Sequence, residues 1–192
     1  PICKAVVVSK LDTIETTTAL QVNFSHHDVD EFCASTQGFD VEFRQLDHGH
    51  LLADLAFFTA PDCNVQHIRL SRRFHQAGST PEDMITFGLP DVRTLKSWRG
   101  RSFSSPSLLN FYRPNGYDSV SESGFSAYTF AVSEQLLGRE LEALGSTVTP
   151  SKIWASGDWR IPDASTRLRL QSIGALLVSD GCITQGNTER LN

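Results

Sequence analysis

The chain has 192 residues, of which 40% are hydrophobic and 20% are charged, and its formal net charge is −5 at pH 7. This length and apolar content suffice for one full domain with an appended piece, or for two small domains. The negative net charge argues against a protein that coats nucleic acid by itself, because such a protein neutralises many phosphates with Lys and Arg. The positive charge is clustered in two runs, Arg69 to Arg73 and Arg93 to Arg101. An acidic protein with local arginine clusters suits a discrete anionic ligand better than a polymer.

Neither the cysteines nor the apolar segments point to an oxidising compartment or to a membrane. The four cysteines, Cys3, Cys33, Cys63 and Cys182, are far apart, and none forms a Cys-x-x-Cys unit. No stretch approaches the ~20 apolar residues that cross a bilayer. The run from Ala5 to Val8 is also too short for a signal peptide. We therefore expect free thiols, a cytoplasmic location and no membrane partner.

The chain changes from helical to β character near residue 38. Ser25, followed by acidic residues, predicts an N-cap and a helix over about 26–36. Apolar and polar residues then alternate in short runs that are separated by turn signals such as Pro114-Asn115-Gly116. Many short strands without intervening helices indicate a β sandwich or barrel. The predicted strands cover 39–43, 51–58, 63–70, 84–89, 95–98, 108–112 and 125–132.

The pattern becomes helical after Ser133, which is suited to cap a helix that Gly145 ends. A connector leads to a second predicted helix over 163–180. Its apolar stripe requires another surface, either the β domain or a second subunit. The predicted fold is therefore mostly β with C-terminal helices (α+β). It comprises a β-barrel or jelly-roll domain over 1–132 and a helical linker or dimerisation segment over 133–192.

A characteristic succession of segments runs through residues 20–145. It includes Ile68 to Pro81, Thr86 to Pro90, Trp98-Arg99-Gly100, Pro114 to Asp118, Gly124-Phe125 and the predicted helix from Glu134 to Leu144. This succession resembles the N-terminal regulatory domain of AraC-type transcription regulators. The resemblance implies a cupin-like barrel that senses a ligand, followed by helices that form a homodimer. It further implies that DNA is bound through a helix-turn-helix domain that this chain lacks, so the chain is expected to be a bacterial sensor and not an enzyme.

The arginine run is the predicted ligand site. Arginine offers five donors in a rigid fork, so neighbouring arginines are suited to bind phosphate. In a strand, Arg69 and Arg73 would share a face while Arg72 points the other way, and a turn after Leu70 would let all three converge. Alternatively, the run is a solvated charged turn or a set of structural ion pairs with Asp91 or Glu82.

The spacing Arg-x-x-x-Arg is similar to the first half of the cyclic di-GMP motif of PilZ domains. The second half of that motif reads Asp/Asn-x-Ser-x-x-Gly. In this chain Ser121 and Gly124 have the matching spacing, whereas Ser119 replaces the acidic or amide residue. The resemblance implies cyclic di-GMP as the effector and no other cofactor. The predicted ligand-binding residues are Arg69, Arg72, Arg73, Ser119, Ser121 and Gly124.

Two alternatives to this site remain open. The same regulatory domain would bind a sugar or another small effector inside the barrel, in a cavity lined by phenylalanines of the predicted strands. The chain would instead be a metal-dependent cupin enzyme if His48 and His50, with Asp54, supplied part of a metal site. No Gly-x-Ser-x-Gly elbow or Gly-rich phosphate loop is found in the sequence. The phenylalanines are Phe39, Phe43, Phe57 and Phe58.

Overall fold

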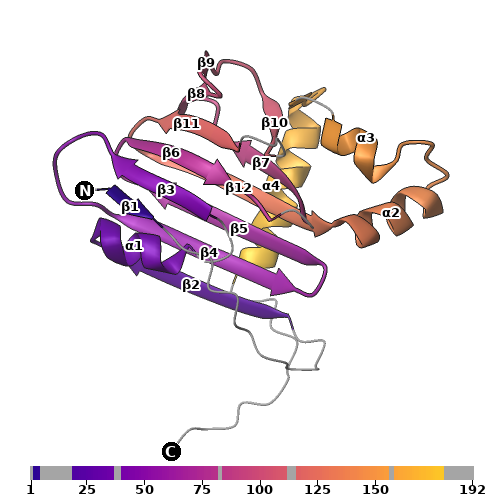
Figure 1. The fold of residues 1–192 in the computed structure, drawn as a ribbon, viewed down its shortest axis with the longest axis horizontal. Coiled ribbons are helices and arrows are strands. Elements are labelled where there is room, and N and C mark those ends of the chain that lie inside the picture. Colours follow the sequence, from indigo (N-terminus) through magenta and orange to yellow (C-terminus); the bar gives the residue numbers. More distant parts are fainter. Residues whose placement is uncertain are drawn as a thin grey trace, which may run out of the picture.

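The computed structural model describes residues 2–4, 19–36, 40–81, 84–111, 116–155 and 158–179. In these residues the chain forms two antiparallel sheets and several helices that pack against them (Figure 1). Sheet A contains, in spatial order, β1 (Ile2–Lys4), β3 (Asp40–Gln45), β6 (Phe74–Ser79), β11 (Tyr117–Ser121), β8 (Leu95–Trp98) and β9 (Arg101–Ser102). Sheet B contains β13 (Trp159–Arg160), β10 (Ser107–Asn110), β7 (Met84–Pro90), β12 (Phe125–Ser133), β5 (Cys63–Leu70), β4 (Ala53–Ala60) and β2 (Leu20–His26). The helices are α1 (Val29–Ser35), α2 (Glu134–Ala143), α3 (Pro150–Ala155) and α4 (Ala164–Val178). The prediction of a mostly β fold with C-terminal helices is confirmed.

The central strands of the chain alternate between the two sheets and pair in a nested order. From β5 to β8, each strand lies in the sheet opposite to that of the strand before it. The later strands fold back over these, so that β11 pairs with β6 and β12 pairs with β5. This order is typical of a double-sheet jelly roll. Within the described residues the sheets keep separate edges, and no closed barrel is seen.

The core lies between the sheets, and several strands alternate buried and less buried residues along their length. In β12, for example, Phe125, Ala127, Thr129 and Ala131 are all buried, while the residues between them are not. Alternation of this kind is the expected pattern of a strand with one face on the core. The largest side chains at one end of the core are three phenylalanines whose rings meet edge to face or tilted, namely Phe32, Phe43 and Phe74.

Helix α1 covers this end of the core and contributes Phe32 to it. Its N-cap is Asp28, whose carboxylate accepts hydrogen bonds from the backbone N–H of Asp30 at 2.8 Å and of Glu31 at 3.3 Å. The prediction that Ser25 caps this helix is wrong, because β2 continues through His26. The Ser25 hydroxyl instead donates to Asp54 at 2.7 Å. Both residue types are good caps, so local sequence did not distinguish between them.

Helix α4 lies on the outer face of sheet B, where it packs against β4, β5 and β12 (Figure 1). Asp163 caps it by accepting from the Thr166 N–H at 2.7 Å. The helix approaches the sheet closely at Gly174, which is buried against the ring of Tyr128. The predicted second helix is therefore confirmed, and of its two expected supports the β domain is the one that it contacts.

We expect Gly174→Ala to destabilise the protein and Gly138→Ala to stabilise it, although both glycines lie inside helices. Exchanging an interior helical glycine for alanine gains up to about 1 kcal/mol. A Cβ at Gly138 would meet only Pro150, at 3.7 Å, whereas one at Gly174 would lie 2.6 Å from Cδ1 of Tyr128. Overpacking typically costs about 1–3 kcal/mol, so the net loss at Gly174 is about 1 kcal/mol. Urea unfolding of the two variants tests this difference in sign, and equal stabilisation of both would contradict the close packing of α4.

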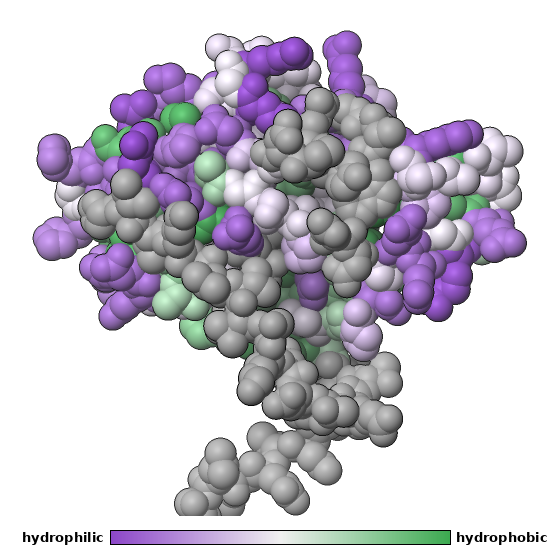
Figure 2. All heavy atoms as spheres, in the orientation of Figure 1, coloured by the Kyte–Doolittle hydropathy of each residue, from purple (hydrophilic) through white to green (hydrophobic). Residues whose placement is uncertain are grey.

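The face of the molecule drawn in Figure 2 is largely hydrophilic, with apolar residues in small groups between polar ones. Among the helices of the described residues, none has the length and apolar content that crossing a membrane requires.

Candidate functional site

The structure directs the three arginines of the predicted site into three different surroundings. Strand β5 ends at Leu70, and the turn that follows is held by Ser71, whose backbone N–H donates to the Leu52 carbonyl at 2.9 Å. Arg69 precedes this turn and is exposed on the outer face of sheet B, between Asp54 of β4 and Ser126 of β12 in the strand ladder. A turn after Leu70 is thus present, as one version of the prediction required.

Arg72 and Arg73 have protein partners. Nε of Arg72 donates to the His50 carbonyl at 3.0 Å, and its guanidinium packs over Gly49. Nε of Arg73 lies 3.0 Å from Oε2 of Glu122 in an ion pair. Arg72 therefore fastens the loop between β3 and β4, while the charge of Arg73 is balanced by a carboxylate.

Two of the three other predicted ligand residues lie beside the arginine run, since Ser121 contacts Phe74 and the Gly124 N–H donates to the Leu70 carbonyl at 3.0 Å. The Ser121 side chain is fully buried, and its hydroxyl accepts from the Phe74 N–H at 3.2 Å. Gly124 is exposed in the turn before β12, with a φ of +78° that favours glycine. Ser119 is 3% exposed and lines the space between the sheets. Of the six predicted residues, Ser119 alone lines this internal space.

We expect Arg72→Ala to lower the free energy of unfolding by about 1 kcal/mol and Arg69→Ala to change it by less than about 0.5 kcal/mol. The first change removes a charge-assisted hydrogen bond from a partly buried position, whereas the second removes an exposed side chain. Urea unfolding of each variant beside the wild type measures the two changes in the free energy of unfolding. A loss at Arg69 as large as that at Arg72 would show that Arg69 also has a structural role.

The two histidines of the alternative metal site lie in the loop between β3 and β4, on either side of Gly49. His48 and His50 are both exposed. Asp54 is on β4, where it accepts the hydrogen bond from Ser25. Across the described ranges, no group of three or more His, Cys, Asp or Glu residues could hold a metal ion.

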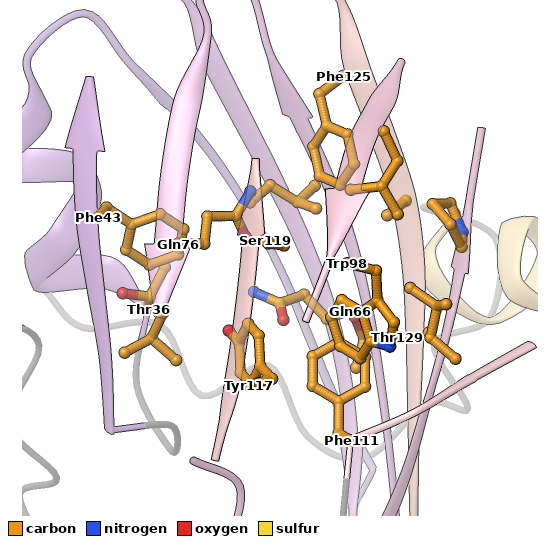
Figure 3. A pocket seen from close by; sticks show the side chains of 17 residues that line it. Thr36, Phe43, Gln66, Gln76, Trp98, Phe111, Tyr117, Ser119, Phe125 and Thr129 are labelled. Carbon is orange, nitrogen blue, oxygen red and sulfur yellow. The ribbon is translucent and has the colours of Figure 1, made fainter. Parts of the chain in front are cut away.

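A cavity of about 60 Å³ lies between the two sheets, with walls from both of them (Figure 3). This volume has room for a few water molecules or a small molecule. The cavity is partly open, and none of the described residues that line it carries a charged side chain. Its polar lining consists of Thr36, Gln66, Gln76, Tyr117, Ser119 and Thr129.

The two glutamines extend into this space from opposite sheets, Gln66 from β5 and Gln76 from β6 (Figure 3). Gln76 is only 8% exposed, and its amide nitrogen Nε2 is buried without a hydrogen-bond partner in the described part of the chain. A buried amide donor without a partner costs about 1–3 kcal/mol. Such a group is uncommon in folded proteins, and a bound molecule that accepts its hydrogen bond would remove the cost.

One wall of the cavity is a cluster of three aromatic rings. The Trp98 ring stacks on that of Tyr117 at 5.4 Å between centroids, and Phe111 meets the two edge to face at 5.0 Å and 4.7 Å. Burial raises the pKa of the Tyr117 hydroxyl, which therefore stays protonated at physiological pH. The cavity thus combines an apolar aromatic wall with neutral amide and hydroxyl groups.

The sequence contained a signal for these residues that the prediction did not use. In β5, Gln66 has the same parity as Ile68 and Leu70, and in β6 Gln76 has the same parity as Phe74. Because side chains of one parity face one side of a sheet, a polar residue among inward apolar ones marks a candidate binding position.

A second titratable group lies on the opposite side of sheet B. The His67 ring stacks on Tyr128 at 4.1 Å, and its Nε2 is 3.0 Å from the Ser126 hydroxyl. Desolvation by burial lowers the pKa of His67 to about 4; Arg69 adds to this shift and Asp54 opposes it. His67 is therefore neutral at physiological pH.

Comparison of the chain with protein-family models, with curated proteins and with solved structures finds no match. Function is therefore inferred from the residues of the cavity and their surroundings.

Proposed function

We propose that the chain is a ligand-sensing domain that binds a small uncharged, hydroxyl-bearing molecule in the cavity between its sheets. The observation that carries the proposal is the buried Nε2 of Gln76, which faces the cavity without a partner in the described residues. A ligand hydroxyl or carbonyl would accept this hydrogen bond. The ring cluster of Trp98, Phe111 and Tyr117 would pack against its apolar face.

The lining favours a neutral ligand over a charged one. An anion in this cavity would be desolvated without a guanidinium or ammonium group beside it, which is strongly unfavourable. A sugar-like molecule has the required mixture of hydroxyl groups and apolar ring faces. At about 60 Å³, the cavity fits such a molecule only after side chains around its opening move outward.

The jelly-roll order of the strands supports the wider proposal of a cupin-like sensor similar to those of AraC-type regulators. A homodimer is part of this proposal. Helix α4 exposes Leu168, Ile173 and Leu176 on the side facing away from sheet B, with exposed fractions of 62%, 51% and 65%. Sedimentation of the chain at several concentrations tests for the dimer.

Thermal-shift titration with neutral pentoses, hexoses and short polyols, beside cyclic di-GMP, tests the ligand class. A ligand at 100 times its Kd adds about 2.7 kcal/mol to stability, which raises the Tm by several degrees. We expect a neutral compound to raise the Tm of the wild-type protein and of Arg69→Ala. If cyclic di-GMP alone raises it, and Arg69→Ala or Arg73→Ala removes the effect, the ligand site is the arginine run and the cavity proposal is wrong.

A further inference from the structure

Helix α4 and the segment before it contact residues that line the cavity, or their neighbours on the same strand, from the side away from the cavity. We propose that filling the cavity changes how firmly α4 is held on sheet B, through three contacts: Trp98 with Asp158, Pro90 with Arg167, and Tyr128 with Gly174. This inference rests on the proposed function, since it assigns the element that responds to the ligand. Each of the three contacts joins a wall of the cavity to α4 or to the chain that leads into it.

The first contact runs from the aromatic wall to the chain before α4. The Trp98 ring lines the cavity, and its indole N–H donates to Oδ1 of Asp158 at 3.2 Å. The same oxygen accepts from the Asn110 N–H at 2.9 Å. Asp158 directly precedes β13, and the Ile161 N–H then donates to the Pro106 carbonyl at 3.1 Å, just before the N-cap Asp163. A shift of the indole ring therefore displaces the support on which α4 begins.

The second contact joins the first turn of α4 to the end of β7. Pro90 is fully buried and lines the cavity, and its carbonyl accepts a hydrogen bond from Nη2 of Arg167. Nη1 of Arg167 is buried without a hydrogen-bond partner in the described part of the chain. Burial lowers the pKa of Arg167, while the nearby Asp91 carboxylate opposes this shift. The Pro90 carbonyl thus supplies a hydrogen bond to this partly buried guanidinium. A movement of Pro90 would weaken that bond and loosen the first turn of α4 from sheet B.

The third contact lies at the middle of the helix. Ala127 and Thr129 of β12 line the cavity, and Tyr128 between them points to the other face of the sheet. There the buried Gly174 packs so closely on the Tyr128 ring that it leaves no room for a Cβ. The ring is also stacked on His67, so it has little freedom to turn aside. A displacement of β12 is therefore passed to α4 and not absorbed by the side chain.

A ligand shifts such an equilibrium only when it binds the two arrangements of α4 unequally. The geometry provides for this, because two wall residues that a ligand would touch, Trp98 and Pro90, are hydrogen-bonded to α4 or to the chain before it. Coupling between two sites typically corresponds to about a 5- to 150-fold change in an equilibrium.

Hydrogen exchange of the full 192-residue chain, without ligand, tests the coupling. Ala127→Val fills part of the cavity from β12. Trp98→Phe keeps a ring in the wall but removes the indole N–H. We expect both to raise the exchange rate of α4 amides relative to those of α2 by at least about 5-fold. Phe74→Leu is the matched control, because Phe74 is a core residue at 0% exposure that does not line the cavity.

If the exchange rate of α4 amides relative to α2 amides is unchanged in Ala127→Val and Trp98→Phe, the inference is wrong. An equal change of this ratio in Phe74→Leu would also overturn it, because exchange of α4 would then depend only on the overall stability of the protein. Asp158→Ala removes the same hydrogen bond from a residue at the surface, so it serves if a core variant does not fold. These outcomes need no ligand. Failure of the coupling is therefore distinct from failure of the proposed function, which the compound titration tests.

Discussion

Replacing Gln76 with leucine is expected to make the protein more stable by about 1 kcal/mol and to abolish ligand binding in the cavity. Gln76 is buried, and its amide nitrogen has no hydrogen-bond partner in the described residues. Removing a buried donor without a partner recovers part of the roughly 1–3 kcal/mol that its desolvation costs. Leucine is similar in size and fills the same space with apolar atoms. Urea unfolding measures the first effect, and loss of the thermal shift with the neutral compound measures the second.

Ser121→Ala is the matched control for this variant. Ser121 is also buried on sheet A, but its hydroxyl accepts the Phe74 N–H, so its loss should destabilise the protein by about 1 kcal/mol and leave binding unchanged. Polar residues that raise stability when removed are typical of binding sites, because function retains them against their cost. If Gln76→Leu destabilised the protein as Ser121→Ala does, the Gln76 amide would be structural and the cavity would lose its main support as a binding site.

Lowering the pH from about 6.5 to 4 is expected to destabilise the protein by about 2 kcal/mol through His67 alone. The pKa of His67 is lowered to about 4 in the folded protein, from 6.5 without burial. Between these values the unfolded chain binds the proton and the folded protein does not, so stability falls as the pH falls through this window. The full shift would correspond to about 3 kcal/mol, and the remaining solvent contact of His67 reduces this figure.

His67→Gln isolates this effect from the other titrating groups. Urea unfolding at pH 7 and at pH 4.5 gives the pH-dependent loss for each protein, and the difference between the wild type and the variant belongs to His67. We expect the variant to lose less stability than the wild type. Equal losses would show that His67 is solvated in the folded protein, and hence that α4 does not bury this part of sheet B.

The strands that were predicted are those with strong apolar alternation. The runs at 63–70 and 125–132 correspond closely to β5 and β12, which lie side by side in the middle of sheet B. The sequence alone did not reveal β6 and β11, which read Phe-His-Gln-Ala-Gly-Ser and Tyr-Asp-Ser-Val-Ser. Their polar and small residues are typical of turns, and their pairing with each other stabilises them as strands.

The candidate site was harder to predict than the fold, because a charged side chain can find partners far away in the sequence. The spacing of Arg69, Arg72 and Arg73 gave no indication that Glu122 would balance Arg73, or that the carbonyl of His50 would hold Arg72. Ser119 was named for its spacing from Gly124, yet it faces the cavity because of its parity in β11. Cyclic di-GMP binding by the arginine run stays a prediction that the compound titration tests.

The nested strand order also has a consequence for how the chain folds. Strand β12 is central in sheet B, between β5 and β7, yet it is made after every other strand of that sheet except β13. Until residue 133 has left the ribosome, β5 and β7 each present an open edge to the solution, and such edges invite pairing with other chains. The pairs of Leu70 with Phe125 and of Cys63 with Val132 join distant parts of the sequence. Folding dominated by such pairs is slow, on the order of milliseconds to seconds. To avoid aggregation, β12 of the newly synthesised chain must therefore pair with β5 and β7 before their open edges pair with a strand of another molecule.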